Sequence, residues 1–166
     1  MVAESASSVA TMVDDLKTAG AQRILVLNVP NLGLVPAATS NPVAATASAN
    51  LFNTTLTSAL AGTSGVEVVD IFNGTTDIVS DPALFGLDNV TDSCITTAFP
   101  DCSEYLFWDE AHPTTAGHAL IADAALPHAI SLTAIPLPGT LPLMISALAG
   151  MRLLGRKRLQ SVYMKT

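Results

Sequence analysis

The sequence predicts an α/β fold in which helices alternate with strands of a parallel sheet. Two short segments rich in apolar residues, 23–29 and 66–71, are separated by a helical pattern over residues 42–60. A strand, a helix and a strand joined by short links form a βαβ unit, which builds parallel sheets. A further helical pattern precedes this unit and another follows it. The alternation of the two element types therefore predicts the α/β class.

The first predicted helix covers residues 3–19 and ends before Gly20. Its apolar residues recur at intervals of three and four, which predicts one buried face. The residues expected on that face are Val9, Met12, Val13 and Leu16.

The first predicted strand runs from Arg23 to Val29, is almost wholly apolar and closes at Pro30. A continuous apolar run is the pattern of a strand that is buried on both faces of a parallel sheet. The residues after it form a loop at the carboxyl end of the strand, where ligands of open α/β sheets bind.

The alternation continues after the second strand. A short helix is predicted over residues 72–80. A loop is predicted over residues 81–108, and its length indicates a functional role. The last helix is predicted from Thr114 to Leu126, because Pro113 favours the first turn of a helix.

Asp109 and His112 lie three residues apart on the turn before this last helix. A carboxylate beside an imidazole can hold the ring in one tautomer and stabilise the imidazolium that forms when the ring takes a proton. The pair is therefore half of a nucleophilic catalytic site. From the residues alone two alternatives stay open: Asp109 caps the helix and His112 is a surface residue, or the two belong to a metal site, for which nothing nearby clearly offers further ligands. His118, within the helix, is predicted to be structural.

The distribution of charge excludes one class of partner. All 14 acidic residues lie between Glu4 and Asp123, whereas five of the seven basic residues lie after residue 150. A body this acidic repels phosphate backbones, so no nucleic-acid binding is expected.

Cys94 and Cys102 are the two cysteines of the chain. A structural zinc site normally takes four ligands, and no other soft ligand is near these two in the sequence. We predict a disulfide, which places the body in an oxidising compartment, with two free thiols as the alternative. No export signal is visible from Met1 to Ser8, which hold an acid and small polar residues.

The run Glu104-Tyr-Leu-Phe-Trp-Asp-Glu-Ala-His-Pro-Thr-Thr-Ala-Gly-His118 resembles the last conserved block of the SGNH/GDSL serine esterase and lipase family. The resemblance extends to residues 24–33, 66–72 and 81–94 and covers roughly residues 5 to 128. It implies a flavodoxin-like three-layer α/β/α fold, here an incomplete sheet fragment, with an ester or lipid substrate and no cofactor. By this resemblance Asp109 is the orienting acid and His112 is the general base.

The other catalytic groups of that family have no counterpart in the chain. The family's serine lies in a Gly-Asp-Ser motif near the N-terminus, and a Gly and an Asn from two later blocks donate hydrogen bonds to the oxyanion. None of these blocks is present, and Gly86-Leu-Asp-Asn89 comes too late in the chain to be the Gly-x-Asn-Asp block. We therefore expect residues 1–130 to be the C-terminal portion of a hydrolase domain, inactive by itself. The alternative is a non-catalytic, surface-anchored protein of unknown role.

Residues 131–166 are predicted to form a second region with a Pro-rich linker, a hydrophobic helix and a basic tail. Residues 135–142 hold three prolines, and the 17 residues from Ile135 to Met151 carry no charge, which is the lower limit for spanning a bilayer. The basic residues after Met151 are expected in the cytoplasm by the positive-inside rule, with the body outside. The alternative is an apolar helix that packs on the body.

This second region is similar to the PEP-CTERM sorting signals in their Val-Pro-Leu-Pro-Ala variant. Ile135 and Gly139 replace the Val and the Ala of that variant, and eight residues follow the basic cluster. The resemblance implies an exosortase-type processing enzyme and the membrane as partners. It also implies a protein exported to the bacterial cell surface or beyond.

Overall fold

The computed structural model describes residues 1–96, 101–133 and 146. The chain divides into two compact units, Met1–Thr133 and Ala134–Thr166. The Pro-rich linker, hydrophobic helix and basic tail that the sequence predicts lie in the second unit, outside the described residues, and stay predictions. Within the described part of the chain, no helix combines the length and the hydrophobicity that crossing a bilayer requires.

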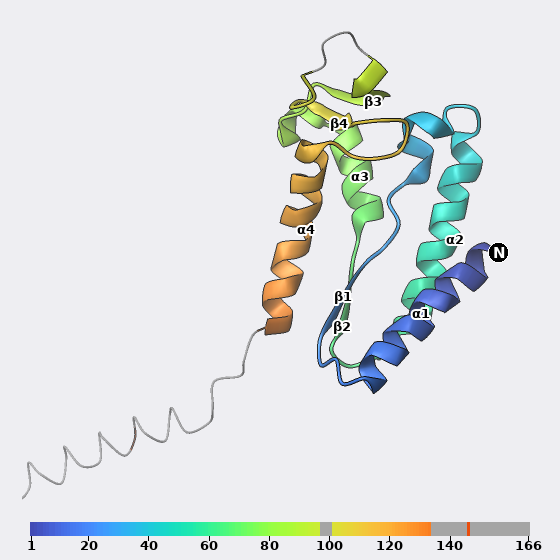
Figure 1. Cartoon of the computed structure of the whole chain (residues 1–166), viewed down its shortest axis with the longest axis vertical. Helices are drawn as coiled ribbons and strands as arrows, with labels where there is room; N and C mark the ends of the chain where they lie inside the picture. Colours follow the sequence, from blue (N-terminus) through green and yellow to red (C-terminus); the bar gives the residue numbers. More distant parts are fainter. Residues whose placement is uncertain (97–100, 134–145, 147–166) are drawn as a thin grey trace, which may run out of the picture. The chain divides into compact units, whose positions relative to one another are not determined.

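Helices and strands alternate along the first unit (Figure 1). The helices are α1 (Val2–Thr18), α2 (Pro42–Leu60), α3 (Ile71–Ser80) and α4 (Thr115–Thr133). The strands are β1 (Ile24–Leu27), β2 (Val66–Val69), β3 (Asn89–Ser93) and β4 (Tyr105–Phe107). Short 3-10 turns are η1 (Leu32–Leu34), η2 (Pro36–Ala38), η3 (Pro82–Phe85) and η4 (Cys94–Thr96). Both strand pairs, β1 with β2 and β3 with β4, are parallel, so the predicted α/β class is confirmed.

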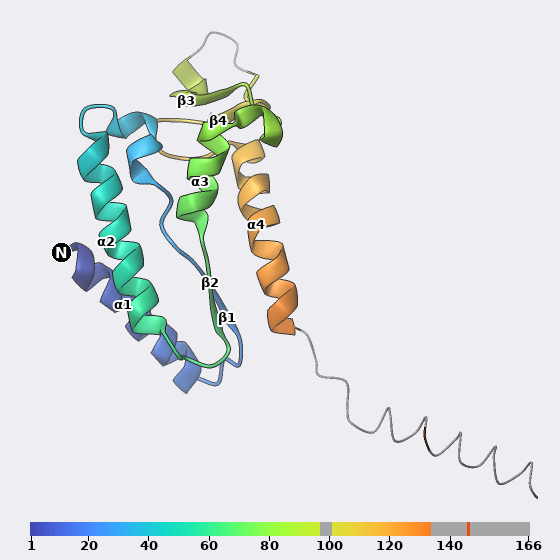
Figure 2. The same cartoon turned by 180° about the vertical axis from the view of Figure 1, so that it is seen from behind.

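The β1–β2 sheet lies between two layers of helices, with α1 and α2 on one face and α4 on the other (Figures 1 and 2). Its strands pair in the register Ile24 to Val66. Val26 and Val68, which share a face with that pair, pack against the buried core of α1 and α2. On the opposite face, Glu67 contacts His128 of α4 at 2.6 Å. This helix, sheet and helix order is the one expected for an incomplete three-layer fold.

The buried face of α1 agrees with the predicted one at Val13, which is buried, and at Val9, which is partly buried, and it differs at Met12 and Leu16. Ala6, Ala10 and Val13 are buried, whereas Met12 and Leu16 are 61% and 51% exposed. The short alanine side chains allow α1 to pack closely against α2, so the contact forms around them and not along the stripe of largest residues.

The prediction that β1 is buried on both faces was wrong. Ile24, Leu25 and Val26 are only half-buried, and Leu27 is 43% exposed. Among the described residues β1 pairs with β2 alone, so one edge of β1 has no strand beside it. Full burial of an apolar strand requires neighbours on both edges, which these residues do not supply.

The segment predicted as one long loop, residues 81–108, contains the strands β3 and β4. β3 is built from Asn, Val, Thr, Asp and Ser and lacks the apolar alternation by which strands are recognised. The pair is held by a second core, to which Leu87, Val90, Leu106 and Phe107 contribute. The last helix also continues past Pro127 to Thr133, beyond the predicted end at Leu126.

Candidate active site

Asp109 and His112 lie on a tight loop between β4 and α4. The chain folds back on itself there: Phe107 and Pro113 form an antiparallel bridge, and the N–H of Trp108 donates to the carbonyl of His112 at 2.8 Å. The two ends of the loop are therefore joined by backbone contacts, and residues 109–111 form its tip.

The carboxylate of Asp109 contacts both the ring of His112 and the loop's own backbone. The Nδ1 atom of His112 lies 2.8 Å from Oδ2 and 3.1 Å from Oδ1 of Asp109. Oδ1 also accepts the N–H groups of His112 at 2.7 Å and of Ala111 at 2.8 Å. These backbone hydrogen bonds lower the pKa of Asp109 to about 2, and the contact with the ring makes a smaller contribution in the same direction. The carboxylate is therefore ionised at neutral pH and fixed in direction.

This geometry prepares His112 to accept a proton. An ionised carboxylate can only accept hydrogen bonds, so Nδ1 carries the ring proton of the neutral imidazole and Nε2 is left as the acceptor. The His112 side chain is 74% exposed, whereas that of Asp109 is 24% exposed. The exposed ring can reach a reacting group, while the acid that orients it is partly shielded.

The helix-cap alternative for Asp109 does not hold. α4 begins at Thr115, and the side-chain oxygen that accepts a hydrogen bond from its first turn belongs to Thr114, at 3.1 Å from the nitrogen of Gly117. His118, predicted to be structural, is exposed, and its Nδ1 lies 2.8 Å from the carbonyl oxygen of Thr114. In residues 1–96, 101–133 and 146, no group of three or more His, Cys, Asp or Glu side chains could hold a metal ion.

A backbone contact joins this loop to the one that follows β1. The N–H of Ala37, in η2, donates to the carbonyl of Glu110 at 2.9 Å. The Asp109–His112 pair thus lies beside the loop at the carboxyl end of β1, on the side of the sheet where α/β proteins bind ligands.

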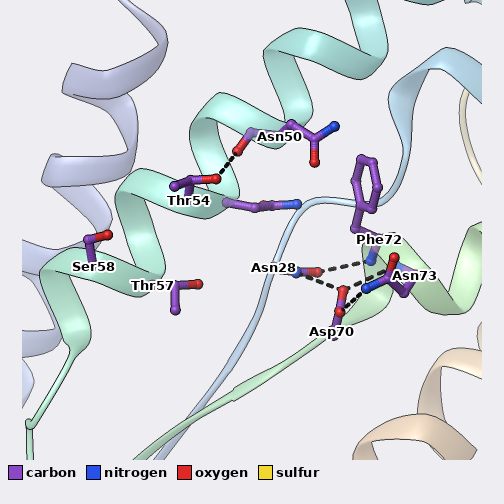
Figure 3. Close-up of a pocket in the computed structure, with 9 residues that line it drawn as sticks. Asn28, Asn50, Thr54, Thr57, Ser58, Asp70, Phe72 and Asn73 are labelled. Atoms are coloured by element: carbon purple, nitrogen blue, oxygen red, sulfur yellow. Dashed lines mark hydrogen bonds between the residues drawn. The ribbon is translucent and has the colours of Figure 1, made fainter.

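A polar cavity of about 360 Å³ lies at the carboxyl ends of β1 and β2 (Figure 3). Three of its polar side chains are joined by hydrogen bonds. Asn28 accepts the N–H of Ile71 and donates to Asp70, and Asn73 donates to Asp70. This network fixes the turn from β2 into α3. Neither Asp109 nor His112 lines this cavity.

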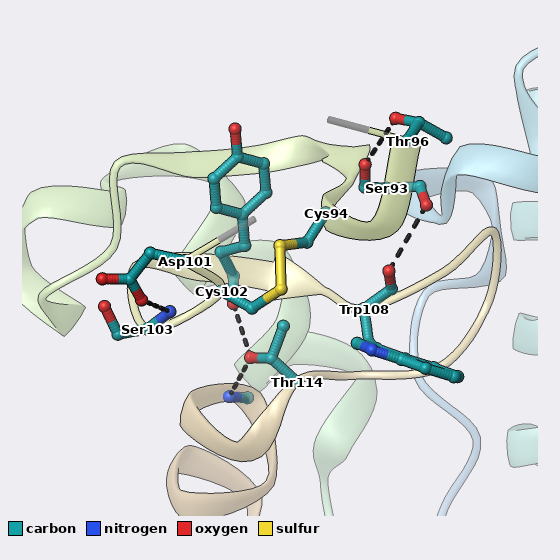
Figure 4. The surroundings of a disulfide bond; sticks show 10 residues. Ser93, Cys94, Thr96, Asp101, Cys102, Ser103, Trp108 and Thr114 are labelled. Carbon is teal, nitrogen blue, oxygen red and sulfur yellow. Dashed lines mark hydrogen bonds between the residues drawn. A yellow bond between two sulfur atoms is a disulfide. The ribbon is translucent and has the colours of Figure 1, made fainter. Parts of the chain in front are cut away.

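Cys94 and Cys102 form a disulfide with an S–S distance of 1.97 Å, which joins η4 to the chain just before β4 (Figure 4). Beside it, two buried hydroxyl residues that the sequence analysis did not single out, Ser93 and Thr114, contact the backbone of the β4 segment. A lone serine or threonine has no periodic pattern. The only sequence feature that could have pointed to Thr114 is its position two residues after His112.

Comparison with known proteins gives consistent matches. A family model described as GDSL-like Lipase/Acylhydrolase matches residues 2–125. The chain is 29% identical to the GDSL esterase/lipase At5g22810 of Arabidopsis thaliana, in a match that covers 75% of this chain and 42% of that protein. It is 30% identical to the GDSL esterase/lipase At5g03810 of the same plant, over 75% of this chain and 44% of that protein. The chain thus spans less than half the length of these curated relatives.

Proposed function

We propose that this chain, which belongs to the GDSL-like lipase/acylhydrolase family, supplies the acid and the base of a serine-dependent ester hydrolase. The observation that carries the proposal is the contact between Nδ1 of His112 and the fixed carboxylate of Asp109, at 2.8 Å. Two relatives described as esterase/lipase support the class of substrate, which is a carboxylic ester or a lipid.

In the proposed mechanism a serine hydroxyl attacks the ester carbonyl while Nε2 of His112 takes its proton. The imidazolium that forms is stabilised by Asp109, and it then returns the proton to the leaving alcohol. A water molecule, activated by the same ring, releases the acid from the acyl-serine. Asp109 stays ionised throughout, which its pKa of about 2 permits.

The nucleophile and the oxyanion donors are proposed to come from a part of the protein outside these 166 residues. The sequence contains no Gly-Asp-Ser motif, and the chain spans 42% of the length of one relative. Among the described residues one edge of β1 has no strand beside it, and β1 is only partly buried. Both features support a sheet that accepts a further strand from a segment outside these 166 residues.

The Cys94–Cys102 disulfide supports a further element of the proposal, which is that the protein works outside the reducing cytoplasm. Surface anchoring through the tail, and its processing by an exosortase-type enzyme, remain predictions from residues 131–166.

The proposal is tested with a chimera in which the amino-terminal part of At5g22810 is joined to residues 2–133 of this chain. Hydrolysis of p-nitrophenyl butyrate is measured for the chimera, for the 166-residue chain and for the amino-terminal part alone. We expect turnover from the chimera and none above buffer from either part. A folded chimera without turnover would contradict the proposed function, and His112-dependent turnover by the 166-residue chain would contradict the external nucleophile.

A further inference from the structure

Two buried hydroxyl groups hold the chain on either side of the Asp109–His112 loop. Ser93 and Thr114 are 4% and 3% exposed, and each donates a hydrogen bond to a backbone carbonyl of residues 105–108 (Figure 4). Buried hydroxyls need such partners, because an unpaired polar group in the interior destabilises the fold. These two hydroxyls differ from other buried ones because their partners lie in residues 105–108, directly before the Asp109–His112 loop.

Thr114 joins β4 to the first turn of α4. Its Oγ1 donates to the carbonyl of Tyr105 at 2.5 Å and accepts the N–H of Gly117 at 3.1 Å. Its backbone N–H donates to the carbonyl of Leu106 at 2.9 Å. The residue two positions after His112 is thus held at three points, which fixes the path of the chain as it leaves the loop.

Ser93 holds the chain where it enters the loop. Its Oγ donates to the carbonyl of Trp108, the residue before Asp109, at 3.3 Å, and the N–H of Ile95 donates to the same carbonyl at 3.0 Å. Cys94, between these two donors, is fully buried and bonded to Cys102. The disulfide therefore restrains both groups that hold Trp108.

We infer that Ser93 and Thr114 are positioning residues, which keep the acid and the base of the loop in contact by holding its two ends. The ring of His112 is 74% exposed, so packing does little to hold it, and its direction depends on the backbone of residues 109–112. The N–H groups that fix Asp109 belong to the same backbone. A change of loop path therefore alters the carboxylate and the ring together.

The inference rests on the proposed function only in treating the pair as catalytic, so its first test uses no substrate. In the full 166-residue chain, the titration of the Asp109 carboxyl group is followed by carbon-detected NMR for wild type and for Thr114→Val, Thr114→Ser and Thr115→Val. Thr115 is exposed and begins α4, so its substitution is the matched control.

We expect Thr114→Val to raise the pKa of Asp109 from about 2 toward its ordinary value of 3.8, because the loop N–H groups no longer hold the anion as closely. Thr114→Ser and Thr115→Val should both titrate as wild type. Ser93→Ala keeps the hydrogen bond from the N–H of Ile95 and should raise the pKa of Asp109 by a smaller amount. If Thr114→Val does not fold, the titration of Ser93→Ala tests the inference. An unchanged pKa of Asp109 in a folded Thr114→Val or Ser93→Ala chain would overturn the inference.

The second arm uses the chimera. There Thr114→Val should lower kcat by about tenfold with little change in KM, and Thr114→Ser should restore it. If the wild-type chimera is folded but inactive, the proposed function fails, while the NMR titration still decides whether Ser93 and Thr114 hold the loop.

Discussion

At the scale of single residues, the ionisation of Asp109 sets the state of the site. Because its pKa is lowered from 3.8 to about 2, Asp109 stabilises the folded chain above pH 3.8 and loses that contribution as the pH falls through about 2. Asp109→Asn removes the titrating group, so the free energy of unfolding should fall less steeply from pH 4 to pH 2 than in wild type. Urea unfolding at a series of pH values measures this, and identical slopes would show that Asp109 is not held as described.

The sequence predicted this pair but not the residues that hold it. An Asp and a His three apart before Pro113 are constrained by local chain geometry, so their contact follows from short-range rules. Ser93 and Thr114 bond to carbonyls at positions 108 and 105, and Ser93 is 15 residues from its partner. The partner of a hydroxyl at that separation in the sequence depends on how the whole chain packs, so it could not be predicted from the local sequence.

At the scale of secondary-structure elements, Gly117 sets how closely α4 approaches β4. A Cβ at this position would lie 2.8 Å from Cβ of Pro113 and 2.9 Å from the carbonyl oxygen of Leu106, so the helix would have to shift. Gly117→Ala should lower the free energy of unfolding by about 1 to 3 kcal/mol. Gly74→Ala is the matched control: a Cβ there meets nothing within 4 Å in α3, and a gain of up to about 1 kcal/mol is expected. Equal stability of the two variants in urea unfolding would contradict the close approach.

Glu67 links the sheet to the far part of α4. Its carboxylate accepts from Ser131 and contacts His128, and these interactions lower its pKa. The resulting stabilisation is present above pH 4.5 and is lost as the pH falls through the lowered value. Glu67→Gln should therefore lower Tm at pH 7, with the difference from wild type vanishing in strong acid.

The matched control for this prediction is Glu104→Gln. Glu104 is exposed, and its side chain makes no hydrogen bond with the described residues. Its Tm at pH 7 should equal that of wild type. If Glu67→Gln and Glu104→Gln unfold at the same temperature, the link between β2 and α4 contributes nothing to stability.

The elements themselves were largely predictable, and their contacts were not. Helix periodicity predicted α1 and α2, and runs rich in apolar residues predicted β1 and β2, because these patterns report local burial. The polar strand β3 has no such pattern, and a core that includes Leu87, Val90 and Leu106 packs against it. The buried face of α1 likewise depends on the alanines that meet α2 and not on its largest side chains.

At the scale of the whole molecule, we propose that the chain forms one part of a hydrolase sheet. The α/β class could be predicted from the sequence because strands and helices alternate. The half-burial of β1 could not be predicted, because the burial of a strand depends on the strands beside it. The family match covers residues 2–125, and the chain spans 42% of one relative. Both findings support the proposal that the catalytic unit includes a further segment.

Whether His112 is the base of an ester hydrolase is tested by comparing two histidines in the chimera. His118, on α4, is also exposed but does not contact Asp109, so His118→Ala controls for the loss of a histidine near the site. With p-nitrophenyl butyrate, His112→Ala should lower kcat by about 10³-fold or more, and His118→Ala should leave it within about twofold of the unsubstituted chimera. Similar activities for His112→Ala and the unsubstituted chimera would contradict the account.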